Sequence, residues 1–215
     1  MTTQLRPGDP TIDDSIDVPL GAPVLSVDQR RALLDRVRVV LAVTTGAEPP
    51  SLLGQALDAD GLPDLCAAAF VTLTRDGVLR GCMGNLDADA SLLDNVTGAA
   101  IAAVRYDPRF DPVTPMELPA LHVDISVLGP SSPIRSPIEF RRGVDGVLIA
   151  VGPRRGLLLP EVAIDAGWDA LHMFKAVCTK AGLPPSAWAD PRTRLSTFRT
   201  VRFGGPAVAE IEPEA

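Results

Sequence analysis

The strongest constraint on the fold is an Asp-Gly pair that separates two runs of strand-forming residues. Asp76-Gly77 stands between an apolar run over 65–73 and a second run that begins at Val78. A tight turn between antiparallel strands needs a positive φ, which glycine adopts at little cost, so this pair predicts a β-hairpin. We expect its strands over 65–74 and 78–85.

The second strand of this hairpin carries an unusual sequence, Leu-Arg-Gly-Cys-Met-Gly, at 79–84. Glycine weakens a strand, and it often marks a bulge or a place where another group comes close to the backbone. The segment therefore predicts an irregular strand that presents one thiol, Cys82, between Gly81 and Gly84. Such an arrangement suits a functional site, but it does not by itself identify a reaction.

The other elements follow from apolar periodicity and from residues that start and stop helices. The expected helices and helical turns lie at 26–45, 91–105, 114–117, just after Ser136, 161–166 and 169–181. The expected strands lie at 121–128, 146–151, 156–159 and 194–203. Because strands arrive mostly as hairpins with helices between them, the order of elements predicts an antiparallel α+β fold.

The two ends of the chain differ in composition from the middle. Residues 1–24 are polar, acidic and rich in proline, which predicts a disordered tail without a secretory signal. Residues 206–215 are also acidic, and we expect them to be frayed. The folded part is then 25–205, in which 47–64 form a surface connection.

Charge and hydropathy bear on the possible partners. The formal net charge is −7 at pH 7, so the protein as a whole does not attract nucleic acid or an anionic membrane. No apolar run approaches the length of a membrane span. We therefore expect neither nucleic acid nor a membrane as a partner. Nearly all the positive charge is arginine, which grips carboxylates and phosphates well, so a local anion site remains open.

The three cysteines, Cys66, Cys82 and Cys178, are too few and too odd in number to predict a disulfide framework. A reducing, cytoplasmic location is the expectation that follows. Cys66 and Cys178 lie in apolar patterns, and we expect both in the core. The two histidines, His122 and His172, do not complete a metal-ligand spacing with them, and no phosphate loop or dinucleotide fingerprint is present. The sequence therefore indicates no metal and names no cofactor.

Several motifs in order resemble the AMMECR family, whose bacterial members are also called protein A of the AmmeMemoRadiSam system. Segment 79–84 resembles the family's Leu-Arg-Gly-Cys-Ile-Gly, with Met83 in place of isoleucine. Further stretches resemble the family's other signatures, and they lie at 107–110, 117–119, 122–128, 155–163, 167–168 and 180–184. The resemblance covers nearly all of 25–203.

This resemblance implies an α+β fold of two lobes, each with an antiparallel sheet and helices, and a cleft between the lobes. The larger lobe would use both chain ends, and the segment 79–84 would border the cleft. The family's name suggests association with a Memo-like protein and a radical SAM protein, which are therefore the expected partners. The family has no established reaction, so the resemblance implies a site without its chemistry.

Cys82 is the candidate catalytic residue, because nearby backbone N–H groups and an arginine favour a thiolate and can hold an oxyanion. The candidate substrate-binding residues are Arg80, Gly81, Gly84, Arg109, His122 and Arg155. The alternative for Cys82 is a small buried residue chosen for packing. The alternative for the arginines is ordinary ion pairing with nearby carboxylates.

One polar row invites a mistaken interpretation. His122, Asp124 and Ser126 share one face of the expected strand 121–128. Residues two apart on a strand stand side by side, which is not the geometry of a catalytic triad. We expect this row to be a solvated polar face.

Two functions stay open at this point. The first is an enzyme, or a component of an enzyme system, that acts on a small anionic substrate in the inter-lobe cleft near Cys82. The second is a non-catalytic binding or adaptor module for a partner protein. The lack of an evident general base beside Cys82 favours the second, and the clustering of glycine and polar residues around one cysteine favours the first.

Overall fold

The computed structural model describes residues 21–55, 65–86 and 88–209. Helices combine with two four-stranded antiparallel sheets, which confirms the predicted α+β class. The chain divides into two compact units. The described residues of the first are 25–55, 65–86, 88–126 and 202–209, and those of the second are 21–24 and 127–201. Among the described residues, none of the helices combines the length and the apolar character that crossing a membrane requires. The predicted cleft between lobes stays a prediction.

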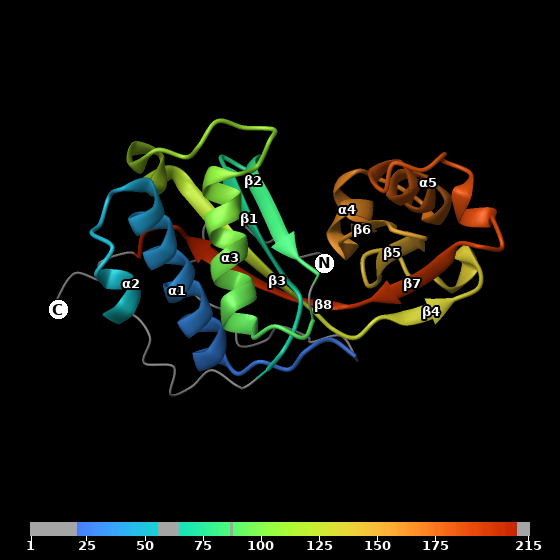
Figure 1. Cartoon of the computed structure of the whole chain (residues 1–215), viewed down its shortest axis with the longest axis horizontal. Helices are drawn as coiled ribbons and strands as arrows, with labels where there is room; N and C mark the ends of the chain where they lie inside the picture. The colour runs from blue at the N-terminus through green and yellow to red at the C-terminus, as the bar shows by residue number, and fades with distance from the viewer. Residues whose placement is uncertain (1–20, 56–64, 87, 210–215) are drawn as a thin grey trace, which may run out of the picture. The chain divides into compact units, whose positions relative to one another are not determined.

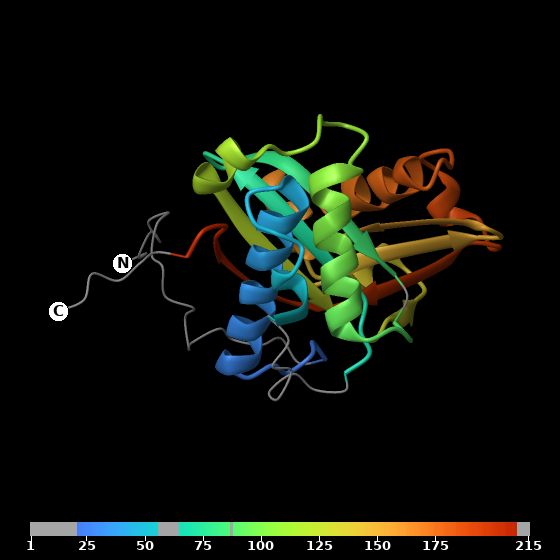
Figure 2. The same ribbon diagram turned by 60° about the vertical axis from the view of Figure 1, so that its left-hand side comes forward.

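Two helices form one layer of the first unit. Helix α1 (Val27–Thr45) begins with the expected capping box, in which the Ser26 hydroxyl accepts the N–H of Gln29 and the Gln29 side chain accepts the N–H of Ser26. It ends at Gly46, whose φ of 86° is left-handed. Helix α3 (Leu92–Arg105) lies beside α1, and both cover one face of the first sheet (Figure 1 and Figure 2).

The first sheet has the strand order β2-β1-β3-β8. Its strands are β1 (Ala69–Arg75), β2 (Val78–Asn85), β3 (Leu121–Leu128) and β8 (Thr200–Pro206). Asp76 and Gly77 both adopt positive φ, at 52° and 77°, so the Asp-Gly pair makes the predicted hairpin turn. Strand β2 is therefore an edge strand, and its outer side has no neighbouring strand among the described residues.

Helix α3 packs closely against this edge strand. A side chain at Gly81 would place its Cβ 2.6 Å from the carbonyl oxygen of Ala103 on α3. The expectation that glycine in this strand permits a close approach is therefore confirmed at Gly81. By contrast, a methyl group placed at Gly98, on the exposed side of α3, would have no described neighbour within 4 Å.

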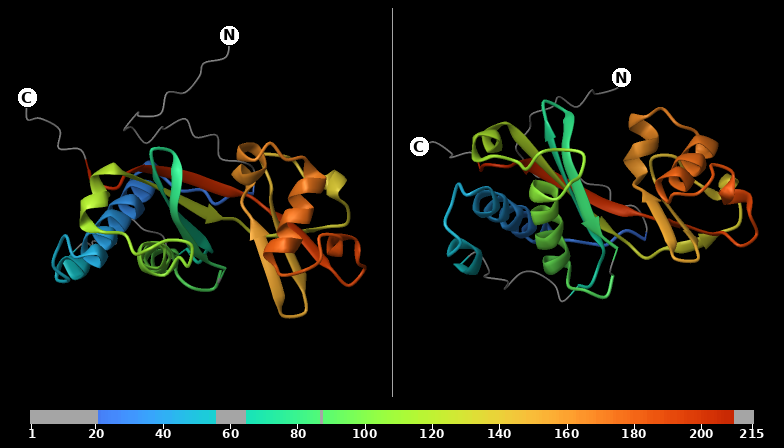
Figure 3. Two further views of the ribbon diagram at one scale, coloured as in Figure 1. Left: turned by 90° about the horizontal axis from the view of Figure 1, so that it is seen from above. Right: turned by 45° about the horizontal axis from the view of Figure 1, so that its top comes forward.

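The second unit contains the sheet β4-β7-β5-β6. Its strands are β4 (Ser132–Ile134), β5 (Gly146–Val151), β6 (Arg154–Leu158) and β7 (Arg194–Phe198). Helices α4 (Pro160–Asp165) and α5 (Ala170–Lys180) pack on this sheet, and α5 contacts both β5 and β6 (Figure 3). The expected hairpin and the two expected helices of this region are confirmed.

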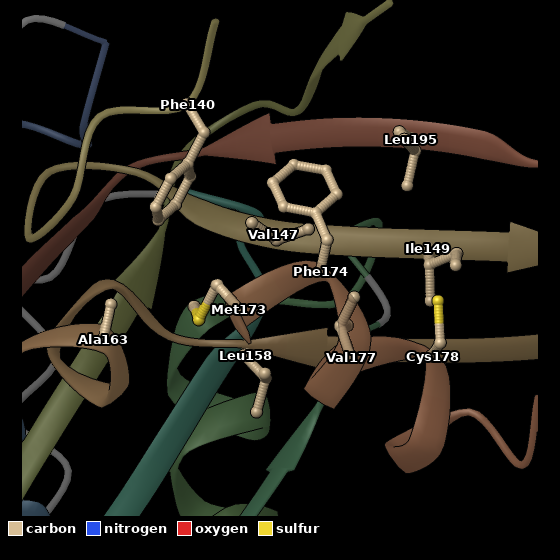
Figure 4. Close-up of a cluster of buried hydrophobic side chains, with 10 residues drawn as sticks. All are labelled: Phe140, Val147, Ile149, Leu158, Ala163, Met173, Phe174, Val177, Cys178 and Leu195. Atoms are coloured by element: carbon tan, nitrogen blue, oxygen red, sulfur yellow. The ribbon is translucent and has the colours of Figure 1, made fainter. Parts of the chain in front are cut away.

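The core of the second unit is centred on Phe174 of α5 (Figure 4). Its ring meets Phe140 and Trp188 edge to face, at centroid separations of 5.9 and 6.4 Å. Cys178 is fully buried in the same cluster, as predicted. Cys66 is instead exposed, so its assignment to the core was wrong: residues 65–68 form only an isolated bridge to Ser91 and do not extend β1 into the sheet.

The last strand also differs from its prediction. Residues 194–203 were expected to form one strand, but β7 and β8 are separate strands of different sheets, with Arg199 between them. The alternation of apolar residues runs through both strands, so periodicity does not reveal the change of sheet. Strand β4 and the short helices α2 (Leu52–Gln55) and η3 (Ala187–Ala189) were not predicted either. The expected helical turns η1 (Pro115–Ala120) and η2 (Pro137–Glu139) are present.

The polar row on β3 is solvated only at its start. His122 is exposed and Asp124 is partly buried, but Ser126 is 1% exposed. Burial rises along this strand, and every residue from Ile125 to Leu128 is buried. The expected solvated face is therefore wrong for Ser126. The expected tails fall largely on 1–20 and 210–215, which lie outside the described residues.

Two glycine substitutions test the packing of α3 on β2. We expect Gly81→Ala to lower the free energy of unfolding by about 1–3 kcal/mol, because the new methyl group meets the fixed backbone of α3. Gly98→Ala is the matched control in open space, and we expect it to raise the free energy by about 0.5–1 kcal/mol through helix propensity. Urea unfolding of both variants measures the difference, and equal effects would contradict the close approach.

Candidate functional site

A bulge at Arg80 sets the orientation of the candidate thiol. The hairpin pairs Thr74 with Leu79 but Leu73 with Gly81, so Arg80 is the extra residue of β2. Beyond the bulge, Cys82 stands directly opposite Thr72. The prediction of an irregular strand at this segment is confirmed.

The bulge decides which face of the sheet Cys82 occupies. With a regular register from the turn onward, Cys82 would pair with Val71, which is completely buried under the helices. The extra residue shifts the pairing by one, so Cys82 shares the opposite face with Thr72, and the side-chain-free Gly81 faces α3. The thiol is half-buried in this position.

An aspartate and an arginine hold the outer edge of β2 at Cys82. The Asp107 carboxylate accepts the N–H of Cys82 at 2.8 Å, and the Arg109 guanidinium donates to the Cys82 carbonyl at 3.2 Å. Arg109 also binds both oxygens of Asp107, at 2.9 and 2.7 Å. We call this arrangement the Asp107–Arg109 clamp. It supplies the edge peptide with the donor and acceptor that a neighbouring strand would otherwise give.

The clamp is electrostatically strong because its carboxylate is buried. The Asp107 side chain is 2% exposed, and the side-chain bonds from Arg109 hold the pKa of that carboxyl far below its ordinary range, with help from the Cys82 N–H. The same pair raises the pKa of Arg109, and the Cys82 side chain makes a smaller contribution in the same direction. The Arg109 guanidinium therefore stays positively charged next to the thiol and paired with Asp107.

The thiol itself has two polar neighbours. The Thr72 hydroxyl donates to Cys82 Sγ at 3.3 Å, and the Arg109 guanidinium is the nearby cation. Arg109 is 52% exposed, and among the described residues its Nη1 atom has no hydrogen-bond partner. One face of this guanidinium is thus open to a small anion beside the sulfur.

Arg80, the extra residue of the bulge, forms an ion pair with a different carboxylate. Its Nε and Nη2 atoms bind the two oxygens of Glu117 at 2.7 and 3.2 Å, with both side chains less than one fifth exposed. Glu117 also accepts the N–H and hydroxyl of Thr114, which closes the first turn of η1. The ring of Phe110 lies under both arginines, with its centroid 5.9 Å from Cζ of Arg80 and 5.5 Å from Cζ of Arg109.

The structure gathers some of the candidate residues and leaves others apart. Arg80, Gly81, Gly84 and Arg109 lie around Cys82. His122 lies on β3, with its Nε2 4.0 Å from an oxygen of Asp124, which Arg202 also binds at 2.9 Å. Arg155 lies on β6 of the second unit and is exposed, and the neighbouring Arg154 donates to the carbonyl of Gly182. The functional roles of all these residues remain predictions.

Three residues of the site were not selected from the sequence. Asp107 and Glu117 stand inside the family signatures, so their carboxylates next to Arg109 and after Pro115 were available signals. Thr72 carried none, because its position opposite Cys82 depends on the bulge. In the described part of the chain, no three metal-ligating side chains of His, Cys, Asp or Glu gather at one place.

Comparison with known proteins decides the family. Residues 35–203 match the AMMECR1 family model. The chain belongs to the AMMECR1 family. A protein of Methanothermobacter thermautotrophicus is 44% identical over 153 residues, which cover 67% of this chain and 80% of that protein. Protein TK0174 of Thermococcus kodakarensis is 38% identical over 184 residues, which cover 81% of this chain and 85% of the relative.

The AMMECR1 fold is also present in a solved structure. The crystal structure of uncharacterized protein PH0010 from Pyrococcus horikoshii superposes with a TM-score of 0.72 at 32% identity, covering 83% of this chain and 93% of that one. The names of these three proteins state no activity. Membership in the AMMECR1 family therefore establishes the fold, and the chemistry has to be argued from the site.

Removing the clamp carboxylate tests its structural role. We expect Asp107→Asn to lower the free energy of unfolding by about 1–3 kcal/mol, because a buried charge-assisted bond to Arg109 is lost. Asp35→Asn, which removes an exposed carboxylate bonded to Arg38 on α1, is the control and should change it by less than about 0.5 kcal/mol. Chemical unfolding at pH 7 compares them, and indistinguishable values would rule out a stabilising clamp.

The Arg80–Glu117 pair predicts an acid-sensitive contribution to stability. Arg80 lowers the pKa of Glu117 from 4.5 to about 2, so the folded state holds the ionised form more tightly than the unfolded state does. The contribution is present above pH 4.5 and is lost as the pH falls toward 2. We expect the free energy of unfolding of Glu117→Gln to fall less than that of the natural chain as the pH is lowered from 4.5 toward 2. Urea unfolding at a series of pH values measures this difference. Parallel pH curves for the variant and the natural chain would contradict the assignment.

Proposed function

We propose that this AMMECR1 protein is an enzyme, or a component of an enzyme system, in which the Cys82 thiolate attacks a small anionic substrate. The observation that carries the proposal is the placement of Cys82 by the bulge: a half-buried sulfur on the face of the sheet away from the helices, bonded to Thr72 and next to the half-exposed guanidinium of Arg109. The thiolate is the nucleophilic form of cysteine, and the adjacent guanidinium offers an anionic substrate a binding group beside the sulfur.

Each group then has a separate task. Cys82 supplies the electron pair that forms the new bond to an electrophilic carbon of the substrate, and the leaving group departs with the pair of the bond that breaks. The open side of the Arg109 guanidinium binds the substrate's carboxylate or phosphate. Asp107 holds Arg109 and the Cys82 peptide in place and does not touch the substrate. Gly84, two residues beyond the thiol, is exposed, and it lacks a Cβ where the ring of its partner Phe70 packs against the strand.

A second candidate function is favoured by the pairing of the arginines. Arg80 and Arg109 both bind carboxylates of the same unit, which reduces the charge left for a substrate. On this alternative the segment 79–84 is a rigid surface of a binding or adaptor module, and the thiol is inert. A Memo-like protein and a radical SAM protein remain the proposed partners under either function, and a cytoplasmic setting remains the proposed location.

A pair of alkylating reagents tests the enzyme proposal, because iodoacetate and iodoacetamide differ chiefly in charge. In both reactions the thiolate sulfur bonds to the reagent's CH2 carbon and iodide leaves with the electrons of the C–I bond. We expect the iodoacetate-to-iodoacetamide rate ratio at Cys82 to exceed that at the exposed Cys66 of the same chain by about fivefold or more. Peptide mass spectrometry of the full chain separates the two sites.

Variants of the guanidinium sharpen this experiment. Arg109→Gln should bring the Cys82 ratio close to the Cys66 ratio, Arg109→Lys should retain part of the preference, and Arg75→Gln at the exposed end of β1 should change nothing. Equal ratios at the two thiols of the natural chain, or alkylation of Cys82 only after unfolding, would exclude the enzyme function proposed here. Either result would support the binding module instead.

A further inference from the structure

The second unit contains a polar pocket that the Cys82 site does not use. Its volume is about 180 Å³, and every lining residue belongs to the second unit. The polar side chains of its lining are Ser132, Arg141, Asp145, Thr197 and Arg199. Arg141 and Asp145 come from the loop before β5, and Arg199 lies between β7 and β8. The two hydroxyl-bearing residues lie on β4 and β7.

A buried carboxylate organises the charges of this pocket. Asp145 has a side-chain exposure of 4%, and it accepts the backbone N–H of Arg141 at 2.9 Å and the guanidinium of Arg141 at 3.2 and 3.3 Å. The Nε of Arg199 lies 3.5 Å from Oδ1 of Asp145, the oxygen that Arg141 Nη2 also contacts. Two guanidinium groups thus surround one carboxylate, which leaves one positive charge in excess.

The second arginine retains most of its hydrogen-bonding capacity. Arg199 is 17% exposed, and among the described residues its guanidinium has no partner other than Asp145. A guanidinium carries five N–H donors, so Nη1 and Nη2 are available to a ligand. Ser132 and Thr197 are paired across β4 and β7, and their hydroxyl groups make no hydrogen bond within the described part of the chain. Ser132 is exposed and Thr197 is partly buried, so both hydroxyl groups are accessible to a ligand that enters the pocket.

The backbone segments near the pocket are also closely packed. The N–H of Gly129 donates to the carbonyl of Arg199 at 2.8 Å. This bond connects the start of the loop after β3 to the residue that joins β7 and β8 in the chain. A Cβ at Gly129 would clash with the carbonyl oxygen of Gly21, another lining residue. Arg199 is therefore held at its backbone on one side and by Asp145 at its side chain.

From these contacts we propose that the pocket binds a small oxyanion, a carboxylate or a phosphate, through Arg199 and Arg141 with the two hydroxyl groups as further donors. Both anion types suit a pair of guanidinium groups. The volume lies below the range of about 300–1,000 Å³ typical of pockets for drug-sized ligands, so the ligand is a small anion or one end group of a larger molecule. This site is independent of Cys82 and of the reaction proposed there.

Titration of the isotopically labelled full chain with inorganic phosphate and with malonate tests the proposal by NMR. We expect saturable shifts of the backbone amides of Ser132, Thr197 and Arg199 with at least one of the two probes. Saturation with phosphate alone identifies a phosphate site, and saturation with malonate alone identifies a carboxylate site. The absence of saturable shifts at these amides with both probes would overturn the proposal.

Variants with opposite expected effects keep the result independent of stability. Arg199→Gln should weaken binding about tenfold or more, and Arg192→Gln, an exposed arginine of the same unit that binds Asp190, should leave it unchanged. Asp145→Asn removes the competing negative charge and should tighten binding severalfold. Equal affinities for the natural chain and Arg199→Gln, or weaker binding to Asp145→Asn with a preserved amide spectrum, would contradict the site.

Discussion

The candidate site depends on one extra residue in a hairpin. The turn at Asp76-Gly77 starts a register that would direct Arg80 toward Leu73 under the helices, where an unpaired charge is costly to bury. The bulge takes Arg80 out of the pairing, and from that point the strand presents its alternate side chains to the opposite faces. The same shift frees Arg80 for Glu117, brings Gly81 under α3 and turns Cys82 toward Thr72. A single irregularity therefore connects the packing of the unit to the placement of its thiol.

An edge strand with a bulge needs a partner for its outward-facing peptides, and the loop after α3 provides one. Exposed strand edges invite pairing with other chains, and proteins commonly cover them. Here the cover is a pair of side chains two residues apart: Asp107 accepts the backbone N–H of Cys82, and Arg109 donates to the backbone carbonyl of Cys82. Because the pair also satisfies its own charges, the peptide is held without a neighbouring strand. The cation that results beside the sulfur is a consequence of this structural role.

Much of the fold was predictable because it is specified locally. Capping residues, glycine stops and the Asp-Gly turn act within a few positions, and the helices at 27–45, 92–105 and 170–180 lie where these signals place them. The errors concern information that is not local. The apolar periodicity of the sequence reveals neither the division of 194–203 between two sheets nor the exposure of Cys66, because each depends on which strands pair in space.

The site shows the same division between local and distant information. The glycines of 79–84 predicted an irregular strand, but the register shift between Leu73 and Thr74 determines that Thr72 pairs with Cys82. Arginines were recognisable as anion-binding residues. The contacts that build the site are distant in sequence, because Glu117 lies 37 residues from Arg80 and Asp107 lies 25 residues from Cys82. Sequence patterns identify residue types well suited to a site, and the pairing of strands determines which of them meet.

The arginines of the two units differ in how much positive charge remains after they pair with carboxylates. At Cys82, each guanidinium has its own carboxylate, so the local charge is balanced and only the open side of Arg109 can attract an anion. In the pocket of the second unit, Arg141 and Arg199 share the single carboxylate of Asp145, and a full positive charge remains. Charge balance therefore favours the second unit for neutralising a whole anionic charge, whereas at Cys82 only the open side of Arg109 is left to orient an anion. On this view the two sites differ in chemistry because their ion pairs differ in stoichiometry.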